Sequence, residues 1–185
     1  MQVNASLPYQ IPSVNRFSRK LLRPVIRGIF HAISRVWITG LENVPGSGPY
    51  LIATNHISLF EPPFVLSFWP VVPEAVGAAE IWERRGQATL ARLFGGIQVH
   101  RGSVDRGMLD AALWVLNSGY PLLIMPEGGR SHSPGLRKAH PGVSYLVEKT
   151  GAPVVPVGIV GTTDDFLGRG LRGQRPAIEM RIGCP

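Results

Sequence analysis

The chain has 185 residues, of which 44% are hydrophobic and 17% charged, a composition that fits one folded domain with a sizeable core. Its single cysteine, Cys184, excludes an internal disulfide framework and a cysteine-rich metal site. The formal net charge of +7 indicates an anionic partner, which could be nucleic acid, a phospholipid surface or a phosphorylated substrate.

The N-terminal segment carries no targeting or membrane-spanning pattern. Residues 1–13 are polar and contain two prolines, so we expect a flexible lead-in. They lack the charged start and apolar stretch of a secretory signal. No later run of apolar residues approaches the roughly 18 that a membrane-spanning helix needs. We therefore expect the protein on the cytoplasmic side, either soluble or attached to a surface.

Residues 14–37 are the most periodic part of the chain and predict a basic amphipathic helix, beginning afresh at Pro24. Basic side chains recur every four residues, with Lys20 beside them, at Arg19, Arg23, Arg27, His31 and Arg35. A second stripe is apolar and consists of Leu22, Ile26, Ile29, Phe30 and Ile33. The helix either lies on an anionic bilayer with its arginines among the headgroups, or docks on the domain through the apolar stripe.

Residues 38–185 alternate between short apolar runs and helical patterns. The predicted strands are Tyr50–Thr54, Ala75–Ala79, Ile97–His100, Pro121–Met125, Val154–Val160 and Ala177–Ile182. The predicted helices are Pro63–Trp69, Ile81–Phe94, Val104–Asn117 and Val143–Thr150. This alternation predicts a single α/β domain with a mostly parallel central sheet flanked by helices. Because the sequence stops directly after a strand, one interpretation is a domain truncated at its C-terminus.

A histidine and a carboxylate follow the first of these strands. His56 stands at the strand end, and Glu61 lies on the turn into the next helix. A carboxylate bonded to one ring nitrogen fixes the tautomer, which leaves the other nitrogen free to take a proton from a hydroxyl. The alternative is structural, because Ser58 and Glu61 have the spacing of a helix capping box.

Two further loops carry arginines beside glycines. Arg101 ends one strand and could hold a phosphate, or could simply pair with Asp105 on the surface. The segment Met125–Ser131 contains Glu127, Gly128 and Arg130, and could cradle an anion or form an ordinary turn with a solvated Glu–Arg pair.

Several other chemistries lack their motif in this sequence. There is no phosphate-binding P-loop, no Gly-x-Ser-x-Gly nucleophile turn and no dinucleotide-binding glycine pattern. No His/Cys spacing suggests a metal site, and we expect no cofactor. Nucleic acid is not an expected partner, because the few aromatic residues are not interleaved with the basic ones.

Taken in order, the loops resemble the glycerolipid acyltransferase family of the 1-acylglycerol-3-phosphate type. The family pattern Asn-His-x-Ser-x-x-Asp is matched by residues 55–61, Asn-His-Ile-Ser-Leu-Phe-Glu. A strand ending in arginine is matched by residues 97–101, and the pattern Phe-Pro-Glu-Gly-Thr-Arg-Ser by residues 125–131, Met-Pro-Glu-Gly-Gly-Arg-Ser. The last block, an apolar strand with an internal proline, is matched by residues 154–157.

The resemblance implies transfer of a fatty acyl group from an acyl-CoA or acyl-carrier-protein thioester to the hydroxyl of a lysophospholipid, with lysophosphatidate the first choice. His56 would be the general base and Glu61 would orient it. The family positions that bind the glycerol-phosphate headgroup fall on Arg101, Glu127, Gly128 and Arg130. We add Lys138 to this set from its charge alone.

The chain departs from the family pattern at two positions. Glu61 replaces an aspartate, so either its carboxylate must fold back or the backbone must shift to reach the imidazole, and Gly129 replaces a threonine beside the headgroup site. These departures leave an alternative, a catalytically weak or inactive member that binds anionic lipid. In either case we expect an anionic membrane surface as a partner and peripheral attachment at the cytoplasmic face of a membrane.

Overall fold

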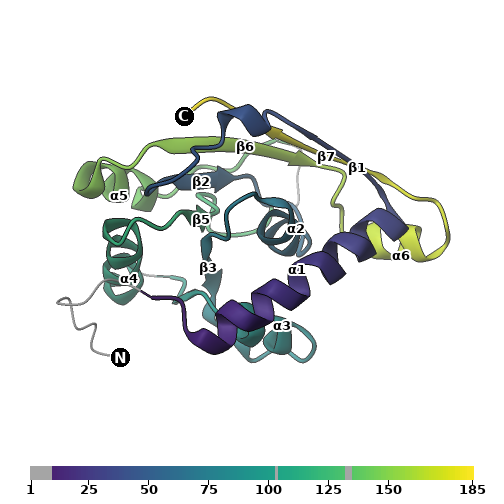
Figure 1. The fold of residues 1–185 in the computed structure, drawn as a ribbon, viewed down its shortest axis with the longest axis horizontal. Helices are drawn as coiled ribbons and strands as arrows, with labels where there is room; N and C mark the ends of the chain where they lie inside the picture. The colour runs from purple at the N-terminus through teal and green to yellow at the C-terminus, as the bar shows by residue number, and fades with distance from the viewer. Residues whose placement is uncertain (1–9, 103, 132–134) are drawn as a thin grey trace.

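The computed structural model describes residues 10–102, 104–131 and 135–185 and confirms the predicted α/β class (Figure 1). Most of the expected lead-in, residues 1–13, lies outside this range. A sheet of seven strands runs in the order β1-β7-β6-β2-β5-β3-β4. The strands are β1 (Arg35–Thr39), β2 (Leu51–Thr54), β3 (Glu74–Ala78), β4 (Ile97–Val99), β5 (Leu122–Ile124), β6 (Val154–Val160) and β7 (Ala177–Ile182).

Helices connect these strands and cover both faces of the sheet (Figure 1). The α-helices are α1 (Ser13–Ile33), α2 (Glu61–Phe68), α3 (Gln87–Phe94), α4 (Arg106–Asn117), α5 (Gly142–Thr150) and α6 (Phe166–Leu171). Two short 3-10 helices, η1 (Leu41–Asn43) and η2 (Ala79–Trp82), complete the described elements.

Strand direction gathers the candidate loops at one edge of the sheet. Neighbouring strands from β6 through β2, β5 and β3 to β4 are parallel, and among the described strands only the β6–β7 pair is antiparallel. The carboxyl ends of parallel strands lie at the same edge, which is where sites form in open α/β sheets. The segments after β2, β4, β5 and β6 therefore share this edge.

The core has two parts, one on each face of the sheet. Aromatic side chains from α2 and α6, including Phe64 and Phe166, are fully buried on one face beside α1. Leu116 of α4 and Leu146 of α5 are fully buried on the other face. Each such side chain contributes about 1.5–3 kcal/mol by its removal from water. These two layers hold the sheet rigid beneath the loops at its carboxyl edge.

The helix predicted over residues 14–37 begins within one residue of the observed start, but its C-terminal bound and its expected break at Pro24 are wrong. The structure has one continuous helix, α1, which contains Pro24 and ends at Ile33. Residues 35–39 instead form β1, which pairs in parallel with β7. The partner strand lies about 140 residues further along the chain. Arg35 falls at the next position of the four-residue basic repeat, but it is the first residue of a strand and not part of the helix.

The predicted helix over residues 81–94 is also divided. Its first part lies in η2, and α3 begins only at Gln87, because Gly86 has a φ of +83° that no helix accommodates. The strands predicted at 154–160 and 177–182 agree with β6 and β7 residue for residue. The short helix α6 was not predicted, because its six residues include two glycines and an arginine and show no helical apolar periodicity.

Candidate functional site

The loop after β2 and the glycine-rich loop after β5 are joined through backbone hydrogen bonds. The N–H of Ser131 donates to the carbonyl oxygen of His56 at 2.7 Å. The N–H of His56 donates to Oε1 of Glu127 at 3.1 Å. The side chain of Asn55 bonds both the N–H and the C=O of Ile159 in β6, at 2.7 and 2.8 Å. Three strand ends thus fix the position of His56.

His56 and Glu61 contact each other. His56 Nδ1 lies 2.9 Å from Glu61 Oε2, and Glu61 is the first residue of α2 and fully buried. The same oxygen accepts the backbone N–H groups of Ile57 and Ser58 at 3.1 and 2.8 Å. This bond has the spacing of a capping box, but α2 begins at Glu61 and its N-cap is Phe60, so Glu61 is not the third helical residue that a capping box requires. The Glu61 carboxylate therefore contacts the imidazole as the catalytic interpretation requires, and the capping-box interpretation is wrong.

The second oxygen of Glu61 accepts hydroxyl groups. Ser58 Oγ donates to Oε1 at 2.8 Å, and Thr162 Oγ1 makes a short hydrogen bond to the same atom. Thr162 lies just beyond β6 and is fully buried. Nothing near Thr162 in the sequence marks it as a neighbour of Glu61, so this contact could not be predicted.

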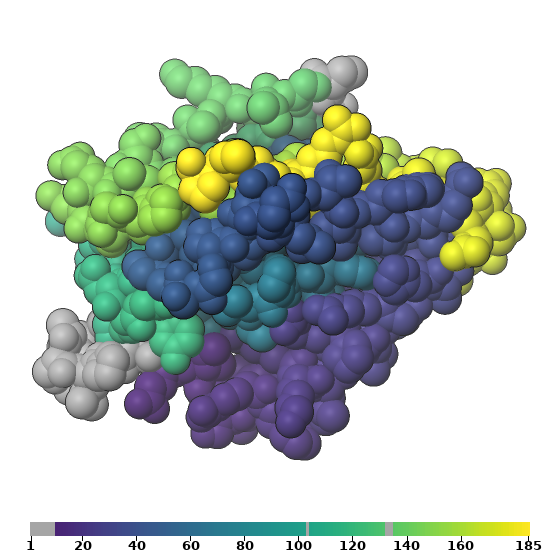
Figure 2. All heavy atoms as spheres, turned by 45° about the horizontal axis from the view of Figure 1, so that its top comes forward, coloured from purple at the N-terminus to yellow at the C-terminus, as the bar shows by residue number. Residues whose placement is uncertain are grey.

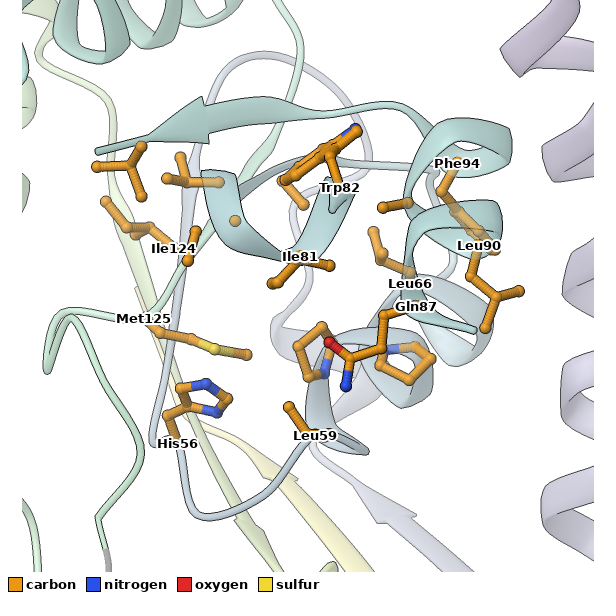
Figure 3. A pocket seen from close by; sticks show the side chains of 18 of the residues that line it. His56, Leu59, Leu66, Ile81, Trp82, Gln87, Leu90, Phe94, Ile124 and Met125 are labelled. Carbon is orange, nitrogen blue, oxygen red and sulfur yellow. The ribbon is translucent and has the colours of Figure 1, made fainter. Parts of the chain in front are cut away.

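An apolar cavity of about 220 Å³ opens beside His56 (Figure 3). Its walls come mainly from α2, β3, η2 and α3, and include Leu66, Ile81, Trp82, Leu90 and Phe94. In Figure 3 His56 and Met125 lie at one end of the cavity, and Phe94 and Leu90 at the other. The imidazole is thus a polar group at one end of a mainly apolar chamber, and the His56 side chain is 10% exposed.

Arg101 lies at the rim of the same cavity and is exposed. The alternative pairing with Asp105 is wrong. The Asp105 carboxylate accepts the backbone N–H groups of His100 and Met108 at 2.8 and 3.0 Å, and it contacts the imidazole of His100. These bonds, led by the one from His100, lower the pKa of Asp105. Asp105 caps α4, and Arg101 faces the cavity instead.

Glu127 is buried within the glycine-rich loop and is not part of a solvated Glu–Arg pair. Its two oxygens accept backbone N–H groups, one from His56 and one from Arg137 at 2.9 Å. Arg130 pairs instead with Asp164, at 3.1 Å. The structure therefore uses the Glu127 carboxylate to connect two loops.

Gly128 and Gly129 leave room for neighbouring side chains. Gly128 lines the cavity with a φ of +62°, and a Cβ there would lie 2.7 Å from the His140 ring. A Cβ on Gly129 would lie 2.9 Å from Nη1 of Arg137, which donates to the carbonyl oxygen of Arg130 at 3.1 Å. Arg137 thus stands where a side chain at position 129 would be. The sequence assigned Lys138 rather than Arg137 to the headgroup site, and both residues are exposed.

Three arginines of α1, Arg19, Arg23 and Arg27, face the domain, so the interpretation that places them among lipid headgroups is wrong. Arg19 forms a buried ion pair with Glu74 at 2.6 Å. Arg23 donates to the carbonyl oxygens of Leu66 and Trp69, and burial together with the charge of Arg27 lowers its pKa. Arg27 donates to a carbonyl at the end of α2. Arg23 and Arg27 thus hold α1 against the helix that carries Glu61, and Arg19 holds it against β3.

Helix α1 docks on the domain through its predicted apolar stripe, which is confirmed for four of the five residues. Ile26 and Phe30 are buried, and Leu22 and Ile33 pack against the core. Ile29 belongs to a different, exposed face. That face, which we call the α1 stripe, consists of Val14, Phe17, Leu21, Val25 and Ile29, which are 51–73% exposed. Figure 2 shows α1 in purple at the periphery of the molecule. None of the described helices is long and apolar enough to cross a membrane.

Comparison with known proteins decides the family. The model of the family described as Acyltransferase matches residues 35–160. The chain belongs to the Acyltransferase family. The match begins at β1 and ends with β6, so it contains every loop described above except the one that carries Thr162.

Named relatives of this acyltransferase-family chain act on lysolipids. It is 28% identical over 151 residues to the lyso-ornithine lipid O-acyltransferase of Pseudomonas aeruginosa, covering 72% of this chain and 58% of that protein. It is 26% identical over 175 residues to human 1-acyl-sn-glycerol-3-phosphate acyltransferase alpha, covering 90% of this chain and 60% of that protein. The chain therefore spans about three-fifths of the length of these relatives.

The fold is shared with a solved acyltransferase. The crystal structure of the 1-acyl-sn-glycerophosphate acyltransferase PlsC from Thermotoga maritima superposes with a TM-score of 0.68 at 24% identity. The match covers 98% of this chain and 74% of that one. At this identity the likeness establishes the architecture.

Proposed function

We propose that this protein is an O-acyltransferase that moves a fatty acyl group from an acyl thioester to the hydroxyl of a lysophospholipid, with lysophosphatidate as the preferred acceptor. The observation that carries the proposal is the buried contact between His56 Nδ1 and Glu61 Oε2 at the mouth of an apolar cavity. The lysolipid acyltransferase names of the relatives support the same reaction class.

In this mechanism His56 is the general base. Because Glu61 accepts from Nδ1, the neutral imidazole carries its proton there and Nε2 has a free lone pair. Nε2 removes the proton of the acceptor hydroxyl as its oxygen attacks the thioester carbonyl carbon. The C–S bond then breaks, the thiolate leaves and takes up the proton from the imidazolium. No acyl-enzyme forms, and Glu61 stabilises the transient imidazolium.

The acyl group occupies the cavity beside His56 in this proposal. Its walls are apolar along α2 and α3 and can accept a hydrocarbon chain, whose burial is favourable by about 0.8 kcal/mol for each CH₂ group. The donor is a thioester of coenzyme A or of acyl-carrier protein, whose carrier part remains outside. No resident cofactor takes part.

The acceptor phosphate binds among the cations at the carboxyl edge of the sheet. Arg101 lies at the cavity rim, and Arg130 lies on the glycine-rich loop with Arg137 against it. Guanidinium groups suit a phosphate because they can donate two parallel hydrogen bonds. Lys138 adds charge nearby. Glu127 acts differently in this proposal: it holds the loops together, since a carboxylate would repel the phosphate.

The α1 stripe attaches the enzyme to the cytoplasmic face of a membrane, where acyl thioesters are available. Its apolar side chains enter the interface, and the exposed cations Arg16 and Lys20 lie beside it, near anionic headgroups. This membrane-binding face differs from the one expected from sequence, in which the regularly spaced arginines of the helix contacted the lipid headgroups.

Release of free CoA from acyl-CoA, in the presence of lysophosphatidate, tests the catalytic assignment. We expect His56→Ala to reduce kcat by at least about a thousandfold, the scale for losing a general base and its partner. His100→Ala is the matched control, because that imidazole is exposed and bonds Asp105. Cys184 is an exposed thiol and gives a stoichiometric background that must be subtracted. A His56→Ala variant as fast as wild type would refute the mechanism.

Binding to vesicles tests the membrane attachment. Leu21→Ser should weaken binding to vesicles that contain phosphatidic acid, because it removes an apolar group that is 54% exposed and contacts little protein. Leu171→Ser is the control, since it makes the same change at a residue that is 73% exposed on α6. Equal effects of the two substitutions would contradict docking through the α1 stripe.

A further inference from the structure

Thr162 is a fully buried polar residue outside every motif discussed above. It lies two residues beyond the end of β6, in a segment that the chain reaches through Gly161. Gly161 has a φ of +91°, and a Cβ there would lie 1.9 Å from the carbonyl oxygen of Ala177. Only glycine fits this turn, which directs the following residue toward the loop of His56.

The hydroxyl of Thr162 has one defined partner, Oε1 of Glu61, which lies 101 residues earlier in the chain. The other donors to the Glu61 carboxylate are His56, Ile57 and Ser58, which belong to a single short loop. Those bonds fix the carboxylate relative to its own loop. The bond from Thr162 is different in kind, because it fixes the carboxylate relative to β6.

This bond constrains the direction of the Glu61 carboxylate. A side chain with one methylene more than aspartate has an additional rotatable bond, so contacts at both oxygens are needed to hold one rotamer. Oε2 meets the imidazole while Oε1 meets Thr162 and Ser58. Loss of the Thr162 hydroxyl would leave Oε1 of Glu61 with Ser58 as its remaining hydroxyl donor. The Glu61 carboxylate could then rotate away from Nδ1 of His56.

We propose that Thr162 is a positioning residue, which holds the Glu61 carboxylate in the orientation that serves His56 and so compensates for the longer acidic side chain. The inference rests on the proposed acyltransferase function and deepens it. Thr162 touches neither substrate nor thioester in this proposal, and it acts only through Glu61.

Steady-state kinetics of Thr162→Val, which keeps the shape and removes the hydroxyl, tests this role. We expect kcat to fall about tenfold to a hundredfold, the range for one hydrogen bond to an ionised group. KM for acyl-CoA and for lysophosphatidate should stay within about twofold, and Thr162→Ser should restore most of kcat. Thr163→Val is the matched control, because the Thr163 hydroxyl bonds the exposed Asp165. A Thr162→Val variant with kcat within twofold of wild type would overturn the proposal.

A double-variant cycle separates positioning from general stabilisation. In a Glu61→Ala background Thr162 has no carboxylate to hold, so adding Thr162→Val should leave the residual rate unchanged. The same fractional loss in both backgrounds would overturn the role. The two proposals can be refuted separately. A turnover rate unchanged by His56→Ala refutes the acyltransferase mechanism. A turnover rate that is lost in His56→Ala but unchanged in Thr162→Val refutes only this inference.

A measurement without turnover tests the same contact. Proton NMR of the wild type should show a His56 Nδ1–H signal protected from solvent by its bond to Glu61. Thr162→Val should speed its exchange with water by about tenfold or more, a rate change that corresponds to one lost hydrogen bond. Unchanged exchange in a fully folded variant would overturn the inference.

Discussion

Replacing Glu61 by Gln removes a charge from the site while leaving most of its hydrogen bonds intact. The amide oxygen can occupy the place of Oε2 and accept from Nδ1 of His56 and the two backbone N–H groups. The amide NH₂ then faces the hydroxyls of Ser58 and Thr162, which can rotate to accept. Because these partners remain, we expect the unfolding free energy to change by only about 1 kcal/mol.

The expected catalytic loss follows from the distance between the two groups. Unit charges 2.9 Å apart attract by about 1.4 kcal/mol at the dielectric constant of water and by about 6 kcal/mol at an effective value of 20. Glu61 is buried and His56 is nearly so, which places the interaction between these limits. We therefore expect Glu61→Gln to lower kcat by about a hundredfold to a thousandfold, since each 1.4 kcal/mol is a factor of ten.

CoA release at saturating acyl-CoA and lysophosphatidate measures this loss, with urea unfolding of the same samples to establish that they are folded. The double variant with His56→Ala should be no slower than His56→Ala alone, because Glu61 acts through the imidazole. A folded Glu61→Gln protein that retains kcat within threefold of wild type would refute the electrostatic reasoning.

Three further predictions concern stability and the acyl chain. Arg19→Met should destabilise the fold by about 3–5 kcal/mol in urea unfolding, because it leaves Glu74 charged, buried and unpaired. Asp105→Ala should cost about 0.5–2 kcal/mol at neutral pH through loss of the α4 cap. Since folding lowers the pKa of that carboxyl, its contribution is present above the unfolded-state pKa and is lost as pH falls through the folded value, which urea titrations at several pH values would reveal. Gly77→Ala should shift the preference among acyl-CoA donors toward shorter acyl chains, because the added Cβ lies on the cavity wall 3.2 Å from a Trp82 ring atom. The control Gly46→Ala, whose Cβ would have no atom within 4 Å, should leave this chain-length preference unchanged.

Much of the sheet could be predicted because its strands are short apolar runs bounded by glycine or proline. The runs that became β6 and β7 were placed residue for residue, and those for β2 and β5 within one residue at each end. The proximity of His56 and Glu61 was also predictable, since both lie in one turn between a strand and a helix.

Other features depended on partners remote in sequence. The segment at residues 35–37 has a basic residue in helical register, but pairing with β7 decides its conformation. Arg19, Arg23 and Arg27 of α1 have the spacing of a membrane-binding face, yet they bond Glu74 and the carbonyl oxygens at the end of α2. Spacing along a helix predicts which side chains share a face, and it does not say what that face will meet.

The order of residues along this chain was enough to establish the α/β class, the amphipathic helix and the histidine–carboxylate pair, because each arises from interactions within a few residues. The folded molecule alone decided that Thr162 reaches Glu61, that Arg137 fills the space beside Gly129, and that an apolar stripe rather than an arginine stripe faces outward on α1. These outcomes required segments up to about a hundred residues apart to meet. A buried hydroxyl such as that of Thr162 bonds the partner that the packed structure offers it, and the residues near it in the sequence do not specify that partner.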